Sequence, residues 1–286
     1  MMKAEEYNTK IKPNFCPGCG DFGIWLALKN VASQLGLDSS NTALIAGIGC
    51  HGHILNFTKI NSIEGLHGRP VPVATGIKLV NPRLNVIAFS GDGDCLGEGG
   101  NHFIHSCRRN HDINLFIHDN AIYGLTTGQT SPRTPHGMVT KSTPEGNKDV
   151  PLNPAAMAIT AGATFVARTF CLEPKHMEEI FTKAIKHKGM SVVQILQTCI
   201  TFNKEYTLDF YRENVYKLPD DYDPSDKVKA LKKAMEWGEK NIPLGVLYEE
   251  KGKPSYEDQL IDISKKPIVD TEPVVKDVTE LFKAHV

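Results

Sequence analysis

The sequence lacks a long apolar segment and lacks an excess of either charge. No apolar run approaches the roughly 20 residues that a membrane-spanning helix needs. Residues 1–13 are polar and contain no apolar core of the kind that a signal peptide has. The formal net charge is −1, so the composition does not indicate nucleic acid or an anionic membrane as a partner. We therefore expect a soluble cytoplasmic protein with no nucleic acid or membrane partner.

The sequence also lacks the cysteine pattern of a disulfide scaffold. It has seven cysteines, and an odd number in a cytosolic protein indicates metal binding or buried thiols. The turn Cys16-Pro17-Gly18-Cys19-Gly20 has no second close pair, which a zinc knuckle would need. The segment before it is a poor strand, which argues against a thioredoxin-like redox pair. An iron–sulfur site stays open, because its thiolates can come from distant parts of the chain.

Apolar strands and amphipathic helices alternate along most of the chain. Strands are predicted at 42–47, 84–90, 113–117, 164–168 and 191–197, and helices from Asp21 and over 71–79, 98–110, 153–163 and 174–188. This alternation predicts an α/β fold with a doubly wound parallel sheet over residues 1–204. The strand at 191–197 is expected to be the last. Residues 205–286, with one charged helix over 225–240, are expected to form an irregular C-terminal extension that wraps a partner subunit.

Two predicted strands each end in a hard oxygen donor. Gly91-Asp92-Gly93-Asp94 follows one strand, and His118-Asp119-Asn120 ends the next. The carboxyl ends of parallel strands share one edge of the sheet, where ligands bind. A carboxylate and an amide oxygen there suit Mg²⁺, and the glycines let backbone N–H groups approach a diphosphate. The alternative to a metal and diphosphate site is a purely structural one, a tight strand-to-helix turn followed by an Asx turn.

The pattern of Gly-Asp-Gly, a helix, a strand and then Asn resembles the thiamine diphosphate motif. By that resemblance, Mg²⁺ is held by Asp92, Asn120 and the carbonyl of Ile122. The residues that would line the diphosphate are Gly93, Asp94, Gly124 and Leu125.

A second glycine-rich loop, residues 47–53, follows the predicted strand at 42–47 and carries Cys50. It should lie at the same edge of the sheet as Asp92. Taken alone, Cys50 reads as a small buried apolar residue, and the two histidines of this loop read as ordinary loop polar groups. Cys107 is expected to pack in the core. His102 and His105 are expected to serve packing or solvent contact, because this pair lacks nearby carboxylates.

These motifs, with Gly65-Leu66-His67-Gly68-Arg69 and Tyr123-Gly124-Leu125-Thr126, together resemble the β subunit of 2-oxoacid:ferredoxin oxidoreductases over roughly residues 12–204. The resemblance implies a thiamine diphosphate, Mg²⁺ and a four-iron four-sulfur (4Fe–4S) cluster. The cluster ligands would be Cys16, Cys19, Cys50 and Cys199, although spacing alone does not choose Cys199 over Cys171. The residues contacting the cofactor would be Ile48, Gly49, Cys50, His51 and His67, with His51 and His67 in catalytic roles.

The family reaction is the oxidative decarboxylation of a 2-oxoacid to CO₂ and an acyl-coenzyme A, with electrons passing through the cluster to ferredoxin. We expect 2-oxoglutarate as substrate, with pyruvate next, and His53 and Arg69 as candidate cations for a distal carboxylate. The sequence holds only one α/β domain, so a partner subunit is expected. The resemblance implies that this partner is a larger α subunit, in a dimer of heterodimers. The rivals are a non-redox thiamine diphosphate decarboxylase or synthase subunit, and a non-catalytic metal-cluster assembly subunit.

Overall fold

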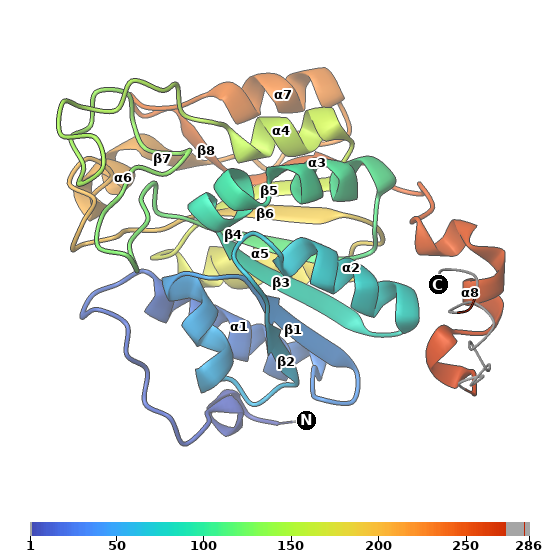
Figure 1. The fold of residues 1–286 in the computed structure, drawn as a ribbon. Helices are drawn as coiled ribbons and strands as arrows, with labels where there is room; N and C mark the ends of the chain where they lie inside the picture. The colour runs from blue at the N-terminus through green and yellow to red at the C-terminus, as the bar shows by residue number, and fades with distance from the viewer. Residues whose placement is uncertain (1, 273–282, 284–286) are drawn as a thin grey trace.

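The computed structural model describes residues 2–272 and 283. Within these residues the strands form one sheet with the order β2-β1-β3-β4-β6-β5-β8-β7, and helices cover both of its faces (Figure 1). The strands are β1 Thr42–Ala46, β2 Ser62–Glu64, β3 Asn85–Gly91, β4 Asn114–Asp119, β5 Phe165–Phe170, β6 Ser191–Leu196, β7 Val215–Lys217 and β8 Ile242–Glu249. Neighbouring strands are parallel except β5 and β8, which pair antiparallel.

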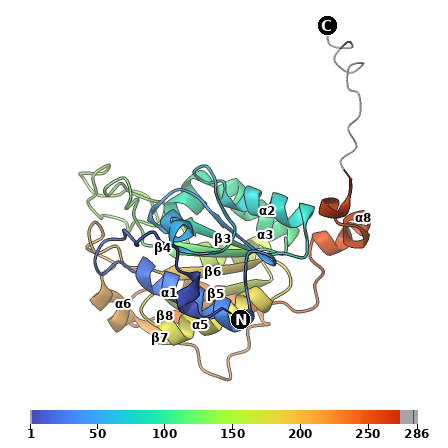
Figure 2. The same cartoon turned by 90° about the horizontal axis from the view of Figure 1, so that it is seen from below.

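The helices divide into two layers. Helices α1 and α5 pack on each other across one face of the sheet, which Figure 2 shows from below, and α2, α3, α4 and α7 cover the other face. Their bounds are α1 Asp21–Leu35, α2 Pro70–Val80, α3 Gly100–Arg109, α4 Pro154–Ala161, α5 Pro174–Lys186, α6 Leu208–Asn214, α7 Lys227–Met235 and α8 Ile261–Lys265. This two-faced arrangement confirms the predicted doubly wound α/β fold.

Each helical layer buries its own apolar core against the sheet. On the first face, Phe116 of β4 stacks on Phe181 of α5 with ring centroids 4.3 Å apart. On the second face, Phe103 of α3 and Ile159 of α4 are fully buried with Leu115 of β4. The neighbouring residues Leu115 and Phe116 therefore point to opposite faces, as successive residues of a strand do. This alternation explains why the central strands read as continuous apolar runs.

The expectation that the strand at 191–197 is the last one is wrong. Strands β7 and β8 extend the sheet beyond β5, and β8 buries Leu244 and Leu247 in the two cores. Its sequence contains Pro243 and Gly245, which disfavour strands and hide the pattern. The short strand β2 was also not predicted, because all three of its residues are exposed at the edge of the sheet. The wrapping of a partner by the extension stays a prediction, and residues 273–282 and 284–286 lie outside the described residues.

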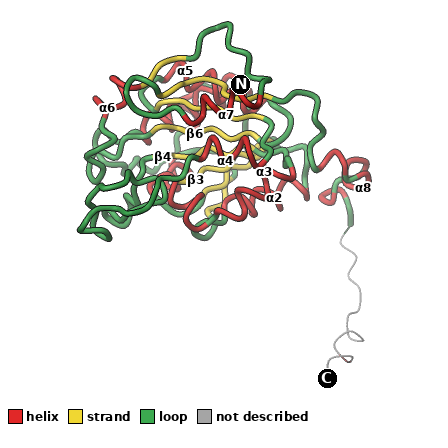
Figure 3. The backbone as a smooth tube through the Cα atoms, turned by 90° about the horizontal axis from the view of Figure 1, so that it is seen from above, coloured by secondary structure: helices red, strands yellow, loops and turns green. Residues whose placement is uncertain are grey.

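Loops gather at one end of the sheet, opposite the end near α8 (Figure 3). Residues 120–153 contain no helix or strand. The predicted helix over 98–110 begins only at Gly100, because Gly93–Glu98 forms a separate π-helical turn. A 3₁₀ helix, Cys50–Phe57, occupies much of the second glycine-rich loop. Nowhere between residues 2 and 272 is there a helix of the length and apolarity that a bilayer crossing requires.

Candidate active site

The register of the sheet brings the predicted site residues to one edge. Gly91 at the end of β3 is paired with His118 of β4, and Asp119 is paired with Leu196 at the end of β6. The side chains that follow these strands, Asp92 and Asn120, therefore start from neighbouring positions. This confirms the geometric premise of the sequence argument, that adjacent parallel strands end side by side.

Asp94 is a buried carboxylate that ties three loops together. Its Oδ1 accepts hydrogen bonds from the backbone N–H groups of Gly68 (2.7 Å) and Ile48 (3.1 Å), and its Oδ2 accepts one from the Ser90 hydroxyl (2.5 Å). A side chain at Gly47 would collide with this carboxylate, since a Cβ there would lie 1.9 Å from Oδ2. Asp94 thus fixes the loops that carry the other predicted residues.

The two predicted catalytic histidines lie beside Asp94. His67 Nδ1 is 3.0 Å from Asp94 Oδ1 but is not aligned for a hydrogen bond, and its side chain is partly exposed. His51 is buried, and its Nε2 accepts a hydrogen bond from the backbone N–H of Gly91. Burial lowers the pKa of His51 to about 4. His51 is therefore neutral at pH 7, and its Nε2 is held as an acceptor.

The long loop after β4 closes over Asp92 and the end of β4. The Ser131 hydroxyl donates to the Asp92 carboxylate, and Arg133 Nε donates to Asp119 Oδ2 at 2.8 Å. Burial, and next the charge of Asp119, raise the pKa of Asp92 to about 7. A buried carboxyl of this kind is costly to ionise without a cation close by. It therefore fits a divalent metal ion, whose charge would stabilise the ionised form.

Asn120 forms the Asx turn of the alternative interpretation, with its Oδ1 accepting a hydrogen bond from the backbone N–H of Ile122 at 3.1 Å. The turn does not exclude the metal role, because a carbonyl oxygen has two lone pairs. Asp92, Asn120 and Ile122 all line one cavity, so a carboxylate, an amide and a backbone carbonyl are available to Mg²⁺.

That cavity, which we call the cofactor cavity, is lined by every residue that the sequence assigns to the cofactor or to Mg²⁺. Its volume is about 60 Å³, far below the 300–1,000 Å³ of ordinary ligand pockets. The cavity as the described residues form it is therefore too small to enclose a cofactor by itself. The residues in question are Ile48, Gly49, Cys50, His51, His67, Asp92, Gly93, Asp94, Asn120, Ile122, Gly124 and Leu125.

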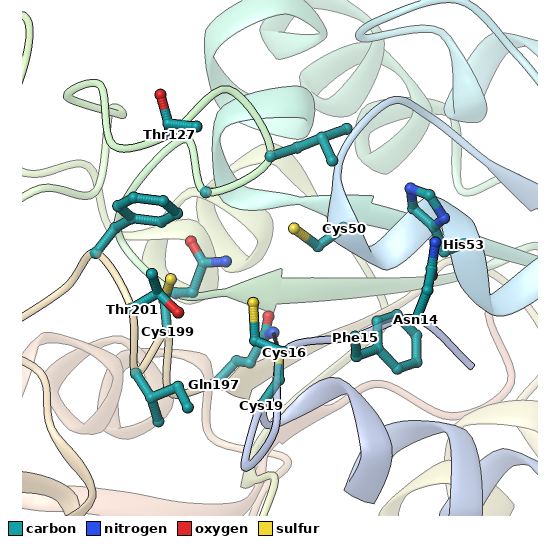
Figure 4. A pocket seen from close by; sticks show the side chains of 15 residues that line it. Asn14, Phe15, Cys16, Cys19, Cys50, His53, Thr127, Gln197, Cys199 and Thr201 are labelled. Carbon is teal, nitrogen blue, oxygen red and sulfur yellow. Dashed lines mark hydrogen bonds between the residues drawn. The ribbon is translucent and has the colours of Figure 1, made fainter. Parts of the chain in front are cut away.

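A second cavity, the cysteine cavity, has a volume of about 220 Å³ and adjoins the first. It is lined by four cysteines, of which Cys16 and Cys19 come from one turn and Cys50 and Cys199 from two other segments (Figure 4). Burial raises the pKa of the Cys50 thiol to about 12 and also raises that of Cys19. These thiols are therefore poor nucleophiles at neutral pH.

The structure separates the two cysteines that spacing left undecided. Cys199 lines the cysteine cavity, and its sulfur lies 3.5 Å from where a Cβ on Gly124 would stand, while the sulfur of Cys50 lies 3.8 Å from the same point. Cys171 is buried in the apolar core beneath Gly20, and Cys107 is buried beside Phe103, as expected for core packing. Among the described residues, no three His, Cys, Asp or Glu side chains converge on one metal ion. A 4Fe–4S cluster does not require that, because each thiolate binds a different iron atom.

The remaining candidates divide between the cavities and the surface. His53 lines the cysteine cavity. Arg69 does not line either cavity, because its guanidinium donates to the backbone carbonyls of Glu98 (2.8 Å) and Gly68 (3.3 Å). His102 and His105 also lie outside both cavities, and His105 accepts a hydrogen bond from Arg108.

Comparison with known proteins agrees with this geometry. Residues 47–195 match the family described as thiamine pyrophosphate enzyme, C-terminal TPP binding domain, and residues 199–265 match the C-terminal region of the pyruvate ferredoxin oxidoreductase beta subunit. The 2-oxoacid:ferredoxin oxidoreductase 1 subunit beta of Aeropyrum pernix is 43% identical, over 96% of this chain and 89% of its own. The 2-oxoglutarate synthase subunit KorB of Archaeoglobus fulgidus is 39% identical, over 88% of this chain and 98% of its own.

The chain belongs to the beta subunits of the 2-oxoacid:ferredoxin oxidoreductases. A solved structure of the 2-oxoglutarate:ferredoxin oxidoreductase from Magnetococcus marinus, with 2-oxoglutarate, coenzyme A and succinyl-CoA bound, has the same fold. It matches with a TM-score of 0.89 and 37% identity, over 99% of this chain and 96% of that chain. The resemblance drawn from the sequence motifs is therefore confirmed.

As a beta subunit, the chain is a component of an enzyme complex and carries a thiamine diphosphate-binding domain. The name of the subunit also implies an alpha partner. Sequence reasoning did not single out three buried polar residues of this beta subunit: Asp21, His118 and Gln197. Asp21 was visible only as a helix start and His118 only as the residue before Asp119. Each is connected to the site by long-range contacts, which leave no local signal.

Proposed function

We propose that this beta subunit, with its alpha partner, oxidises 2-oxoglutarate to succinyl-coenzyme A and CO₂ and passes the electrons through a 4Fe–4S cluster to ferredoxin. The observation that best supports this proposal is the wall that the two cavities share. Cys50, Asn120, Gly124, Leu125 and Gln197 line both of them. A metal cluster in one cavity would therefore lie directly beside a cofactor in the other, which a one-electron transfer needs.

Each group of residues has a separate role in the proposed reaction. Asp92, Asn120 and the carbonyl of Ile122 would hold Mg²⁺, which would neutralise charge on a bound diphosphate. Asp94 keeps the loops of Ile48 and Gly68 in place through its backbone hydrogen bonds. When bound, thiamine diphosphate would supply the nucleophile and the electron sink that decarboxylation of a 2-oxoacid requires.

The cysteine cavity distinguishes the redox enzyme from its rivals. A non-redox thiamine enzyme would leave Cys16, Cys19, Cys50 and Cys199 without a task, although they surround one cavity. An assembly subunit without catalysis would leave the cavity around Asp92 and Asn120 unexplained. Only the oxidoreductase uses both cavities, and neither rival accounts for their common wall.

We expect Cys199→Ala to remove the iron–sulfur cluster and Cys171→Ala to retain it. The reason is position, because Cys199 lines the cysteine cavity whereas Cys171 is enclosed in the core. Iron analysis and visible absorbance near roughly 400 nm on anaerobically purified protein measure the cluster. Full iron content in Cys199→Ala would move the fourth ligand elsewhere. The absence of the band from the unsubstituted protein would favour the rivals.

Substrate choice should depend on His53. A distal carboxylate needs a cation or several donors, and His53 lines a cavity whereas the guanidinium of Arg69 is engaged by two backbone carbonyls. We expect His53→Leu to lower kcat/KM for 2-oxoglutarate by about 10- to 100-fold, the worth of one hydrogen bond to a charged group. The value for pyruvate should change little, and Arg69→Leu should affect both acids equally.

Steady-state kinetics of the assembled enzyme with both acids and a viologen acceptor provides this measurement. Pyruvate preferred more than tenfold by the unsubstituted enzyme would contradict the assignment of 2-oxoglutarate. Equal losses for both acids in His53→Leu would show that His53 does not read the distal carboxylate.

A further inference from the structure

Asp21 is a fully buried carboxylate that contacts one residue from each cavity. Its Oδ1 accepts a hydrogen bond from His118 Nδ1 at 2.7 Å, and its Oδ2 accepts one from the Cys19 thiol at 3.4 Å. His118 lines the cofactor cavity and Cys19 lines the cysteine cavity. Asp21 itself stands at the start of α1, in neither lining. It therefore connects the two cavities from behind their shared wall.

The contact with Asp21 fixes the tautomer of His118. An ionised carboxylate only accepts, so Nδ1 carries a proton, and in the tautomer defined in this way Nε2 is the acceptor. That Nε2 is buried and has no hydrogen-bond partner among the described residues. Gln197 repeats this pattern, because its Nε2 donates to Cys19 Sγ at 3.6 Å while its buried Oε1 has no partner in the same part of the chain.

Two unpartnered acceptors in the lining of one cavity indicate a ligand that supplies donors. Leaving a buried polar atom unpaired is energetically costly, so such atoms are rare without a ligand or water. Both His118 and Gln197 are almost completely buried and line the cofactor cavity. Each is also connected to Cys19, through Asp21 in one case and directly in the other.

The negative charge of Asp21 lies beside both Cys19 and His118. A thiol that binds iron loses its proton, so a thiolate at Cys19 would stand beside the carboxylate. A fixed negative charge there opposes the addition of an electron to a cluster. On the other side, a donor at His118 Nε2 would polarise the ring and strengthen its hydrogen bond to Asp21, as hydrogen bonds in series do. The stronger bond would offset part of the negative charge felt at Cys19.

We propose that Asp21 and His118 form a bridge through which occupation of the cofactor cavity favours reduction of the cluster. The inference rests on the proposed function, since it requires both groups to be present. Asp21 and His118 are positioning residues in it. By reciprocity, the cofactor binds more tightly when the cluster is reduced. A fivefold difference, the lower end of usual couplings, corresponds to roughly 40 mV for a one-electron couple.

The test is a redox titration of the assembled enzyme, followed by electron paramagnetic resonance, without and with saturating thiamine diphosphate and Mg²⁺. We expect the cofactor to raise the midpoint potential in the unsubstituted enzyme by the amount above. In Asp21→Asn the potential without cofactor should already be higher, because a buried negative charge is gone, and the cofactor should shift it little. In His118→Gln the potential without cofactor should stay near its original value, and the shift should again be lost.

His111→Gln is the matched control. His111 is buried, and its Nδ1 pairs with Glu257 at 2.6 Å, much as His118 pairs with Asp21. It precedes β4, whereas His118 lies near the other end of that strand. Neither the potential nor its shift should change in this variant.

Each outcome decides between direct and bridged coupling. A shift of undiminished size in both Asp21→Asn and His118→Gln would mean that cluster and cofactor interact directly through space, which overturns the bridge. If Asp21→Asn assembles without a cluster, His118→Gln decides alone. No shift in the unsubstituted enzyme, with binding shown by calorimetry, overturns the linkage and leaves the proposed function intact. A protein that holds no cluster or no cofactor overturns both.

Discussion

Asp92→Ala is expected to abolish thiamine diphosphate binding by the assembled enzyme. Asp92 is a buried carboxylate in the cofactor cavity and the only acidic member of its proposed metal-binding set, which it forms with Asn120 and Ile122. Loss of a partner that merely orients a metal ligand costs 10- to 100-fold in affinity, so loss of the charged ligand should cost more than about 100-fold. Calorimetric titration with thiamine diphosphate and Mg²⁺ measures this directly.

The same site should show the opposite effect on folding stability. The pKa of Asp92 is raised to about 7 by burial and by Asp119, so the fold disfavours the ionised form. This group therefore lowers stability progressively as pH rises from its ordinary pKa toward 7. Asp92→Asn should raise the thermal midpoint of the cofactor-free protein at pH 8 and leave it nearly unchanged at pH 3.

Opposite signs for binding and stability would distinguish a metal-binding role from a structural one. Asp209→Ala is the matched control, because its carboxylate is largely exposed on α6 and its ion pair is with Arg212, three residues along the same helix. It should change neither quantity. Unchanged cofactor affinity in Asp92→Ala would contradict the assignment of Asp92 to Mg²⁺, and a large loss of stability in Asp92→Asn would make its role structural.

The second large effect is the loss of all turnover when the beta subunit is assayed alone. The resemblance of this chain to thiamine enzymes implies that the reaction needs a glutamate, which activates the pyrimidine ring of the cofactor. None of the described residues lining the cofactor cavity is a glutamate, and the cavity itself measures only about 60 Å³. Glu64 is exposed on the edge strand β2, and Glu98 is not in the lining. The alpha subunit would therefore supply both the missing acid and the missing walls.

Reconstitution tests this expectation. The beta subunit with an intact cluster is mixed with thiamine diphosphate, Mg²⁺, 2-oxoglutarate, coenzyme A and an electron acceptor, and release of CO₂ is followed before and after adding the alpha subunit. The visible spectrum of the same sample confirms that the cluster is intact throughout. Sustained turnover before the addition would place the activating acid in this chain.

Local sequence patterns were enough to predict the strands that position the site. The strand–helix alternation predicted the central strands β1, β3, β4, β5 and β6, because period and turn residues are properties of short segments. The local patterns missed β8, because its proline and glycine weaken the strand pattern. Antiparallel pairing with β5 stabilises this strand in the folded protein. Edge strand β2 was missed for a related reason, since an exposed three-residue strand has no buried face to mark it.

The sequence by itself determined the positions of Asp92 and Asn120, because each follows directly from where a strand ends. Only the tertiary structure decided that Cys199 joins the cysteine cavity while Cys171 enters the core. Both follow a strand, so the direction of the side chain after the strand separates them. The pairing of Asp21 with His118 was equally hidden, because it spans 97 residues. Contacts at that distance depend on how α1 is laid against the end of β4, and packing of the whole sheet sets that arrangement.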